Sequence, residues 1–444
     1  MARAKELLDS SSGSHERRDA KGSHGAPRRR LAGCLVFLML MAIVTAFAWK
    51  PVGVRWRQFR ARELLGRRDE AAALQHLRAA LRYDPDNEET LLLLARTHRR
   101  MGNLERVGRL LTRAEDLGGD RGRIERERRL VLAQCGELRE VEGHLADMLI
   151  HAGEDGPDIC EAFVQGYFAN LRINEALQLL EVWQESYPHD PQPLFMRAYL
   201  FQGMNHPAEA IELYRKGLGM APHKTTMRRR LATVLLEAGR LDDAEAELLL
   251  CARRMPEDAE TWYLLARCIH ARGDVEEARR RLDKSLQLDP DHLDARRLKG
   301  QLDLERGKLD EALAELEQVV QRRPYDILAR EALGRALRAM GRPEEAKAHF
   351  DFVTQAEESI ARMNRLLRES LRKPHEAEVR YQIGTILFRY GPPDDAAKWM
   401  RAALQLDPEH VGAHRALAAY FRQRDEAAKA AFHLQQALLH EPPP

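Results

Sequence analysis

Apolar residues recur along most of the chain at the spacing of short paired helices. In residues 259–292 a first apolar stripe has the i, i+3, i+4, i+7 spacing of one helix face, and it consists of Trp262, Leu265, Ala266 and Ile269. Gly273 then interrupts the pattern, because glycine readily takes the left-handed conformation that ends a helix. A second stripe follows through Ala278, Leu282 and Leu286. The segment is therefore predicted to form two helices joined by a turn.

This unit repeats every 34 residues. The prolines that close successive units are Pro188, Pro222, Pro256, Pro290 and Pro324, and Pro408 and Pro442 are separated by the same interval. Glycines at 239, 273, 307 and 341 and alanines at 210, 244, 278, 312 and 346 keep the same period. A fixed period of this length indicates a repeat architecture, in which each unit buries its apolar face against its neighbours.

The unit resembles the tetratricopeptide repeat, whose pattern is W-x2-L-G-x2-Y, then A-x3-F, then P. The matching places hold Trp262, Leu265, Ala266, Ile269, Ala278, Leu282 and Pro290, and in another copy Arg330, Leu333, Gly334, Leu337, Ala346 and Phe350. The resemblance implies an all-α, right-handed superhelical solenoid of tandem helix-turn-helix hairpins. Eleven candidate hairpins begin near residues 54, 88, 122, 157, 191, 225, 259, 293, 327, 377 and 411. An irregular helical bundle is the alternative.

Departures from the period divide the array. Residues 50–156 are predicted to form degenerate hairpins, because Gly119 and Gly153 stand where the closing proline is expected. Residues 157–357 form the regular array, and residues 377–444 form a C-terminal pair of hairpins. Between them, Glu358 replaces the expected proline and the helical pattern continues to Leu371, so residues 358–376 are predicted to be an extended helix or linker. This segment is either an insertion packed on its neighbours or a hinge.

Residues 31–49 contain nineteen consecutive uncharged residues. As a helix they would span roughly 28 Å, close to the ~30 Å hydrocarbon core of a bilayer, which predicts a single-pass transmembrane anchor. Ala46-Phe47-Ala48 has the small-x-small form of a cleavage site, so a cleavable signal peptide is the alternative. Six Lys and Arg residues precede the segment and seven follow it within twenty residues, so the side of the membrane that carries the repeats is not decided. Residues 1–30 are expected to be a disordered basic and polar tail.

Composition and the absence of known motifs exclude several classes of function. The net charge is only +2 although 32% of the 444 residues are charged, so no nucleic-acid partner is expected. The five cysteines include no CxxC pair and are expected to be mostly small buried residues, although a bridge between Cys251 and Cys268 is conceivable. The sequence contains no HExxH or GxSxG motif, and Gly307-Lys308 lacks the spacing and the Ser or Thr of a phosphate loop. We therefore predict no enzyme activity, catalytic residue, cofactor, metal or small-molecule substrate.

Binding residues are proposed through the resemblance. In tetratricopeptide repeats the second, fifth, ninth and twelfth places of each unit point into the concave groove. Here these places include Phe195, Tyr199, Arg229, Tyr263, Arg267, His270, Arg297, Gln301, Arg335, Arg338 and Tyr381. Arginines can grip carboxylates while aromatics bury area, so the strip is interpreted as a protein-binding groove, with solvated helix faces as the alternative. The predicted function is a membrane-anchored scaffold or adaptor for other proteins, or alternatively an envelope or secretion assembly factor that contacts an anionic polymer or lipid.

Overall fold

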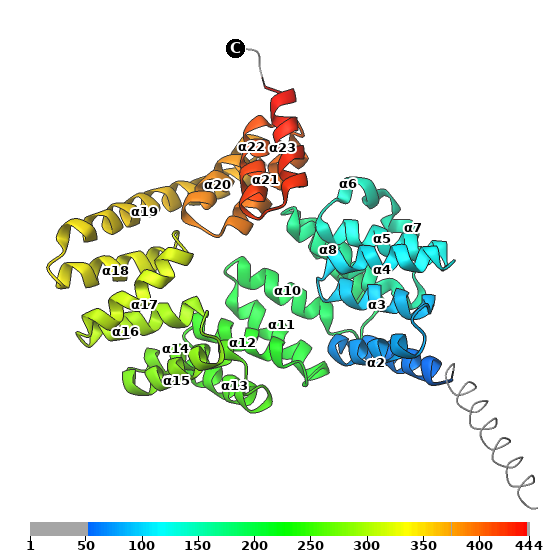
Figure 1. The fold of residues 1–444 in the computed structure, drawn as a ribbon, viewed down its shortest axis with the longest axis horizontal. Coiled ribbons are helices and arrows are strands. Elements are labelled where there is room, and N and C mark those ends of the chain that lie inside the picture. Colours follow the sequence, from blue (N-terminus) through cyan, green and yellow to red (C-terminus); the bar gives the residue numbers. More distant parts are fainter. Residues whose placement is uncertain (1–51, 374, 442–444) are drawn as a thin grey trace, which may run out of the picture. The chain divides into compact units, whose positions relative to one another are not determined.

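The computed structural model describes residues 52–373 and 375–441, and every regular element in these ranges is helical (Figure 1). The prediction of an all-α solenoid of helical hairpins is therefore confirmed for this part of the chain. The predicted tail 1–30 and membrane anchor 31–49 lie outside the described residues. Among the residues that are described, none of the helices has the length and apolar character needed to cross a bilayer.

The chain divides into two compact units, with the boundary after Arg128. The first unit contains a helix over residues 52–66, followed by α2 (Glu70–Tyr83), α3 (Glu88–Arg100), α4 (Leu104–Asp116) and the first part of α5 (Arg121–Cys135). Its core is built from leucines and alanines of the first three helices, including Ala61, Leu65, Leu77 and Leu93.

The second unit holds the longer run of hairpins (Figure 1). After α5 come α6 (Leu138–Val141), η1 (Glu142–His144), α7 (Leu145–Ile150), η2 (Gly153–Asp155), α8 (Gly156–Ala169), α9 (Ile173–Ser186), α10 (Gln192–Gly203), α11 (Pro207–Met220), α12 (Thr225–Glu237), α13 (Leu241–Arg254), α14 (Ala259–Ala271), α15 (Val275–Leu288), α16 (Leu293–Glu305), α17 (Leu309–Arg322), α18 (Ile327–Ala339), α19 (Pro343–Arg372), α20 (Ala377–Tyr390), α21 (Pro393–Leu406), α22 (Val411–Gln423) and α23 (Ala427–Leu439). From α8 onward, each even-numbered helix packs against the odd-numbered helix that follows it, and each pair packs on the next.

Local chemistry sets the ends of the helices. Gly273 follows α14 with φ of 91°, a left-handed conformation that lets the chain turn into α15 without a steric penalty. At the other end of α14, the Asp258 side chain accepts the amide hydrogen bond of Thr261 at 3.2 Å and satisfies an otherwise unpaired donor. The cap at Asp258 and the left-handed turn at Gly273 together limit α14 to between three and four turns.

Small side chains allow the two helices of a hairpin to approach closely. Ala266 and Ala278, predicted at this crossing, are both fully buried. In the next hairpin Gly300 takes the same place as Ala266, and a Cβ atom there would lie 2.7 Å from the Cγ atom of Leu316. Each crossing is thus matched to the size of the residue opposite it, and a larger side chain would separate the helices.

Two segments depart from the regular hairpin. In the hairpin that begins near residue 122, the second helix is broken into α6, η1 and α7, in the region where the sequence carries one extra residue. Helix α19 is 30 residues long and continues through most of the segment predicted as an extended helix or linker. Its far end contributes Leu366 to a cluster with Val379 and Ile383 of α20. The added turns therefore pack on the next hairpin.

Cys251 and Cys268 are both free thiols, so the conceivable bridge between them is not formed. Each is buried and donates to a different backbone carbonyl, Cys251 to Thr225 at 3.6 Å and Cys268 to Leu241 at 3.3 Å. Burial raises the pKa of the Cys251 thiol to about 11. Both side chains therefore fill core positions as small apolar groups.

A buried carboxylate replaces an apolar residue between α15 and α16. Asp303 is 0% exposed and stands where the neighbouring repeats carry Ile269 and Leu337. Its partner is Arg279, whose Nη1 atom lies 3.1 Å from the Asp303 carboxylate. Burial raises the pKa of Asp303 although the nearby guanidinium opposes this shift. The carboxylate oxygens accept no hydrogen bond from the described residues, so the ion pair with Arg279, aided by the more distant Lys299 and Lys308, is what favours the charged form.

The two single substitutions of this pair should have unequal effects. Arg279→Leu leaves a buried, uncompensated carboxylate and should destabilise the array by about 3–5 kcal/mol, whereas Asp303→Leu restores the apolar residue of the neighbouring repeats and should cost much less. The double variant should be at least as stable as the wild type. Urea unfolding followed by circular dichroism at pH 7 measures all four proteins, and equal losses for the two single variants would contradict the argument.

Candidate functional site

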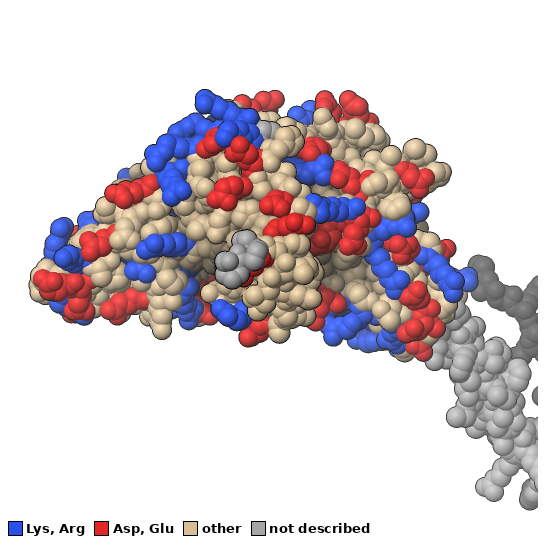
Figure 2. Space-filling view, turned by 90° about the horizontal axis from the view of Figure 1, so that it is seen from above, with Lys and Arg blue, Asp and Glu red and all other residues tan. Residues whose placement is uncertain are grey.

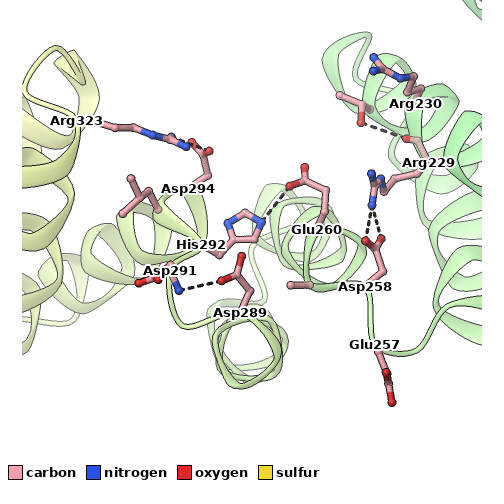
Figure 3. A pocket seen from close by; sticks show the side chains of 13 residues that line it. Arg229, Arg230, Glu257, Asp258, Glu260, Asp289, Asp291, His292, Asp294 and Arg323 are labelled. Atoms are coloured by element: carbon pink, nitrogen blue, oxygen red, sulfur yellow. Dashed lines mark hydrogen bonds and ion pairs between the residues drawn. The ribbon is translucent and has the colours of Figure 1, made fainter. Parts of the chain in front are cut away.

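A cavity of about 730 Å³ lies beside the middle of α12 and the first turns of α14 and α16 (Figure 3). Its lining comes from α12, from the residues that lead into α14 and α16, and from the end of α17. The lining residues are Arg229, Arg230, Thr233, Glu257, Asp258, Ala259, Glu260, Asp289, Asp291, His292, Leu293, Asp294 and Arg323. A volume within the usual ~300–1,000 Å³ of binding pockets is sufficient for several side chains of an extended segment. We call this space the acidic cavity, for the carboxylates that predominate in its lining.

One side of the acidic cavity is formed by an ion pair between successive repeats. The Nη1 atom of Arg229, on α12, lies 2.5 Å from both carboxylate oxygens of Asp258, the residue that caps α14. Burial opposes ionisation of Asp258, but hydrogen bonds from Arg229 and Thr261 outweigh it and lower the pKa of this carboxyl. The carboxylate is therefore charged at neutral pH and fastens two hairpins together.

The opposite side has a similar ion pair. Arg323, which follows α17, donates from Nη1 to the Asp294 carboxylate at 2.8 Å. Arg297 contacts Asp294 at 3.0 Å and Asp326, the cap of α18, at 3.6 Å. Burial again opposes ionisation, while the two guanidinium groups hold the pKa of Asp294 below its usual value. The result is a chain of charges that continues into the next repeat.

His292 lies between these two ion pairs, and Figure 3 shows its ring directed at Glu260. The Nε2 atom is 3.0 Å from the Glu260 carboxylate, and the Nδ1 atom accepts the amide hydrogen bond of Ala295 at 3.2 Å, which caps α16. This pairing assigns the proton of the neutral ring to Nε2. Burial disfavours the charged ring, but Glu260 and two nearby aspartates raise the pKa of His292 above its ordinary value. The ring also packs against Tyr263, with ring centres 5.0 Å apart.

The same arrangement occurs a second time, near the C-terminus. His410 caps α22 through Nδ1, which accepts from Ala413 at 3.2 Å, and its Nε2 lies 3.3 Å from Glu378. The His410 ring is 4.7 Å from that of Tyr381. A glutamate at the second place, a tyrosine at the fifth place and a capping histidine thus recur as one structural unit at the junctions α14–α16 and α20–α22.

Negative charge predominates in the acidic cavity. Its lining includes six carboxylates, on Glu257, Asp258, Glu260, Asp289, Asp291 and Asp294, and three guanidinium groups, on Arg229, Arg230 and Arg323. Two of these arginines already pair with Asp258 and Asp294. The third, Arg230, stacks its guanidinium on the ring of Tyr199 at 4.9 Å. The remaining carboxylates favour a cationic group as the occupant of the space.

The predicted strip does not form one continuous surface. Phe195 and Tyr263 are only 2% and 7% exposed and belong to the core of the second unit. Arg229 and Arg297 are held in the ion pairs described above. The exposed members of the strip are Tyr199, Arg335 and Arg338, and the half-buried ones are Arg267, His270, Gln301 and Tyr381. The arginine–carboxylate role expected for Arg229 and Arg297 is therefore taken by carboxylates of the protein itself.

The residues that sequence reasoning missed are those just before and at the start of each first helix. Asp258, His292 and Asp326 recur at the 34-residue period as helix caps, and Glu260 and Asp294 occupy the second place of their repeats. The 34-residue spacing of these capping residues is visible in the sequence and could have identified them. The pattern of inward places instead points to arginines and aromatics, and it does not indicate which acidic residues meet them.

Two family models described as tetratricopeptide repeat match the chain, one over residues 257–324 and the other over residues 64–124, 203–250 and 303–369. These ranges include the acidic cavity from Glu257 onward. No curated protein matches the sequence.

Solved structures of helical-repeat proteins align with parts of the chain. MamA (residues 41 to the end) from Desulfovibrio magneticus RS-1 is 23% identical, with a TM-score of 0.25, and covers 49% of this chain and 95% of its own. The pilF protein of Pseudomonas aeruginosa is 19% identical, with a TM-score of 0.39 over 43% of this chain and 88% of its own. A thermophilic TPR protein of Thermus thermophilus is 18% identical, with a TM-score of 0.33 over 45% and 99%. At these scores the alignments add nothing to the family models.

Replacing Glu260 by Gln should lower the pKa of His292, because the carboxylate that favours the charged ring is removed. A histidine whose pKa is raised on folding contributes stability at low pH and loses it as the pH rises through the folded-state pKa. The variant should therefore lose more thermal stability at pH 6 than at pH 8.5. Histidine NMR titration and thermal melts at the two pH values measure these effects. Glu378→Gln is the matched control and should leave the His292 titration unchanged.

Proposed function

Because the chain belongs to the tetratricopeptide-repeat family, we propose that it is a non-enzymatic scaffold that holds segments of other proteins against the hairpins of its second unit. The observation that carries this proposal is the acidic cavity, which spans three successive repeats. An extended segment that runs along the array would meet the middle of α12 and then the starts of α14 and α16. Such a binding mode suits a repeat protein, since each hairpin contributes a small part of one long surface.

The charge of the cavity sets the chemistry of the partner. We infer that the bound segment presents a lysine or arginine side chain, because the unpaired carboxylates of the lining outnumber its unpaired guanidinium groups. Glu257 and Asp289 are exposed and form no ion pair with the described residues, so they can meet a cation without breaking the ion pairs that join the repeats, whereas Asp291 already pairs with Arg322. This inference reverses the polarity expected from the predicted strip, in which arginines grip acidic groups. Arg335 and Arg338 remain candidates for that acidic contact further along the array.

The alternative function, assembly through an anionic polymer or lipid bound by the groove arginines, gains no specific support. Figure 2 displays one face on which basic and acidic side chains are interleaved rather than separated. Arg229 and Arg297 already have carboxylate partners within the chain. A polyanion would have to displace those partners before it could bind to the same arginines.

We also propose that residues 31–49 span a bilayer and place the scaffold beside it. The support for this proposal is the uncharged sequence of nineteen residues with arginines before it and Lys50 after it. An anchor of this kind would raise the local concentration of partners at the membrane surface.

Peptide selection tests the polarity of the acidic cavity. A phage-displayed library of random twelve-residue peptides, panned against the full chain, should yield peptides with Lys or Arg at a fixed position. Glu257→Lys/Asp289→Lys should weaken their binding at least tenfold, about 1.4 kcal/mol, as measured by fluorescence anisotropy. Glu344→Lys/Glu357→Lys makes the same charge change on exposed residues of α19 and should leave affinity unchanged. Enrichment of acidic peptides, or equal binding by both variants, would refute the assignment.

Carbonate extraction tests the anchor. If residues 31–49 span the bilayer, the full chain should stay in the membrane pellet at pH 11, while a chain in which Leu38 and Leu40 are both replaced by Arg should be released, because charges at mid-span are costly. N-terminal sequencing of the membrane-bound protein distinguishes an anchor from a cleaved signal peptide. Release of the unaltered chain would exclude the anchor.

A further inference from the structure

The helix over residues 52–66 presents two opposite faces. One face is buried and contributes Ala61 and Leu65 to the core of the first unit. The other face carries Val52, Trp56 and Phe59 at the i, i+4, i+7 spacing, and these side chains are 61%, 54% and 62% exposed. The exposed stripe is therefore not a displaced part of the core, because the core side of the same helix is already packed. It is an apolar, partly aromatic surface, and although the edge of the Trp56 ring meets His76 of α2 with ring centres 5.7 Å apart, more than half of each of the three side chains stays exposed.

Basic side chains border this stripe. The helix contains four arginines, Arg55, Arg57, Arg60 and Arg62, and a single acidic residue, Glu63. Arg60 pairs with Glu63, and Arg62 pairs with Glu89 of α3 at 2.6 Å. Arg57 stacks on the ring of Tyr83 at 5.2 Å. Within the described residues Arg55 makes no ion pair, so the stripe has an available positive charge at its edge.

We propose that this face of the helix lies in the headgroup region of a lipid bilayer that contains anionic lipid. Trp56 and Phe59 would insert between headgroups while Arg55 meets phosphate, as is typical of helices that lie in the plane of a membrane and bury an apolar face by about 5–10 Å. The inference rests on the anchor proposed above. Only residues 50 and 51 separate the uncharged segment 31–49 from Val52, so the helix must begin within about 10 Å of the end of that segment.

Other occupants of the stripe are less suitable. A second copy of the chain would bring two sets of arginines together across a symmetric contact, which like charges oppose. Residues 31–49 could also fold back onto the helix. The three exposed side chains of the stripe are too few to cover nineteen uncharged residues, so most of the apolar surface of residues 31–49 would stay in water. A bilayer covers both apolar surfaces at once and supplies the anions.

Photo-crosslinking tests this placement on the full chain in vesicles. Benzoylphenylalanine is introduced in place of Trp56, of Phe59 or, as a control, of Phe432 on α23, which is 54% exposed like Trp56. In vesicles of phosphatidylcholine and phosphatidylglycerol, positions 56 and 59 should give at least fivefold more phospholipid adduct by mass spectrometry than position 432. The yield should fall at least twofold in pure phosphatidylcholine, because the anionic lipid is absent.

The outcomes separate this inference from the functions proposed above. Vesicle flotation reports the anchor independently: a chain that floats but gives equal adducts at positions 56, 59 and 432 keeps the anchor and overturns the placement of the helix. A chain that does not float overturns both. Crosslinks from position 56 to a second copy or to residues 31–49 also overturn the placement. Peptide binding by the acidic cavity depends on residues of the second unit and is measured separately on the full chain, so none of these results bears on it.

Discussion

The structure depends on the close crossing of the two helices within each hairpin. Ala266 and Ala278 at one crossing, and Gly300 against Leu316 at the next, bring backbones near enough for the apolar stripes to meet. A hairpin of this size cannot bury its stripe alone, so each pair must also pack on the following pair. This packing brings the capped helix ends of successive hairpins together, and the capping residues there line the acidic cavity.

The repeat architecture was predictable from the sequence because every hairpin must meet the same packing requirement, and the residues that meet it therefore recur in each copy. Glycine at the turn, alanine at the crossing and proline at the close recur at one interval, and each copy supports the others. The broken helix of α6, η1 and α7 was not predictable in the same way. The additional residue in this repeat indicates a shift in register. It does not show whether the helix continues or breaks, because packing against the neighbouring helices decides this.

The candidate site was only partly predictable. The family pattern pointed to inward places such as Arg229 and Arg297, and both do lie at or next to the acidic cavity. The pattern could not predict whether those side chains are free to bind a partner or already form ion pairs within the chain. Arg229 meets Asp258 and Arg297 meets Asp294 and Asp326 across repeat junctions, and such contacts depend on the angle between hairpins. Phe195 illustrates the same limit, since an aromatic residue at an inward place can turn into the core when a glycine, here Gly217, leaves room for its ring.

The ion pairs that line the acidic cavity also fasten one repeat to the next. If a cation binds in the cavity, its charge would also act on the nearby Asp258 and Asp294 carboxylates, each of which holds a guanidinium across a junction, so occupancy and the strength of the junctions would be thermodynamically linked. By the reciprocity of linkage, a bound segment that weakened or strengthened these junctions would itself be bound more tightly or more weakly when neighbouring hairpins shift. The same carboxylates would then serve both the proposed binding and the cohesion of the array.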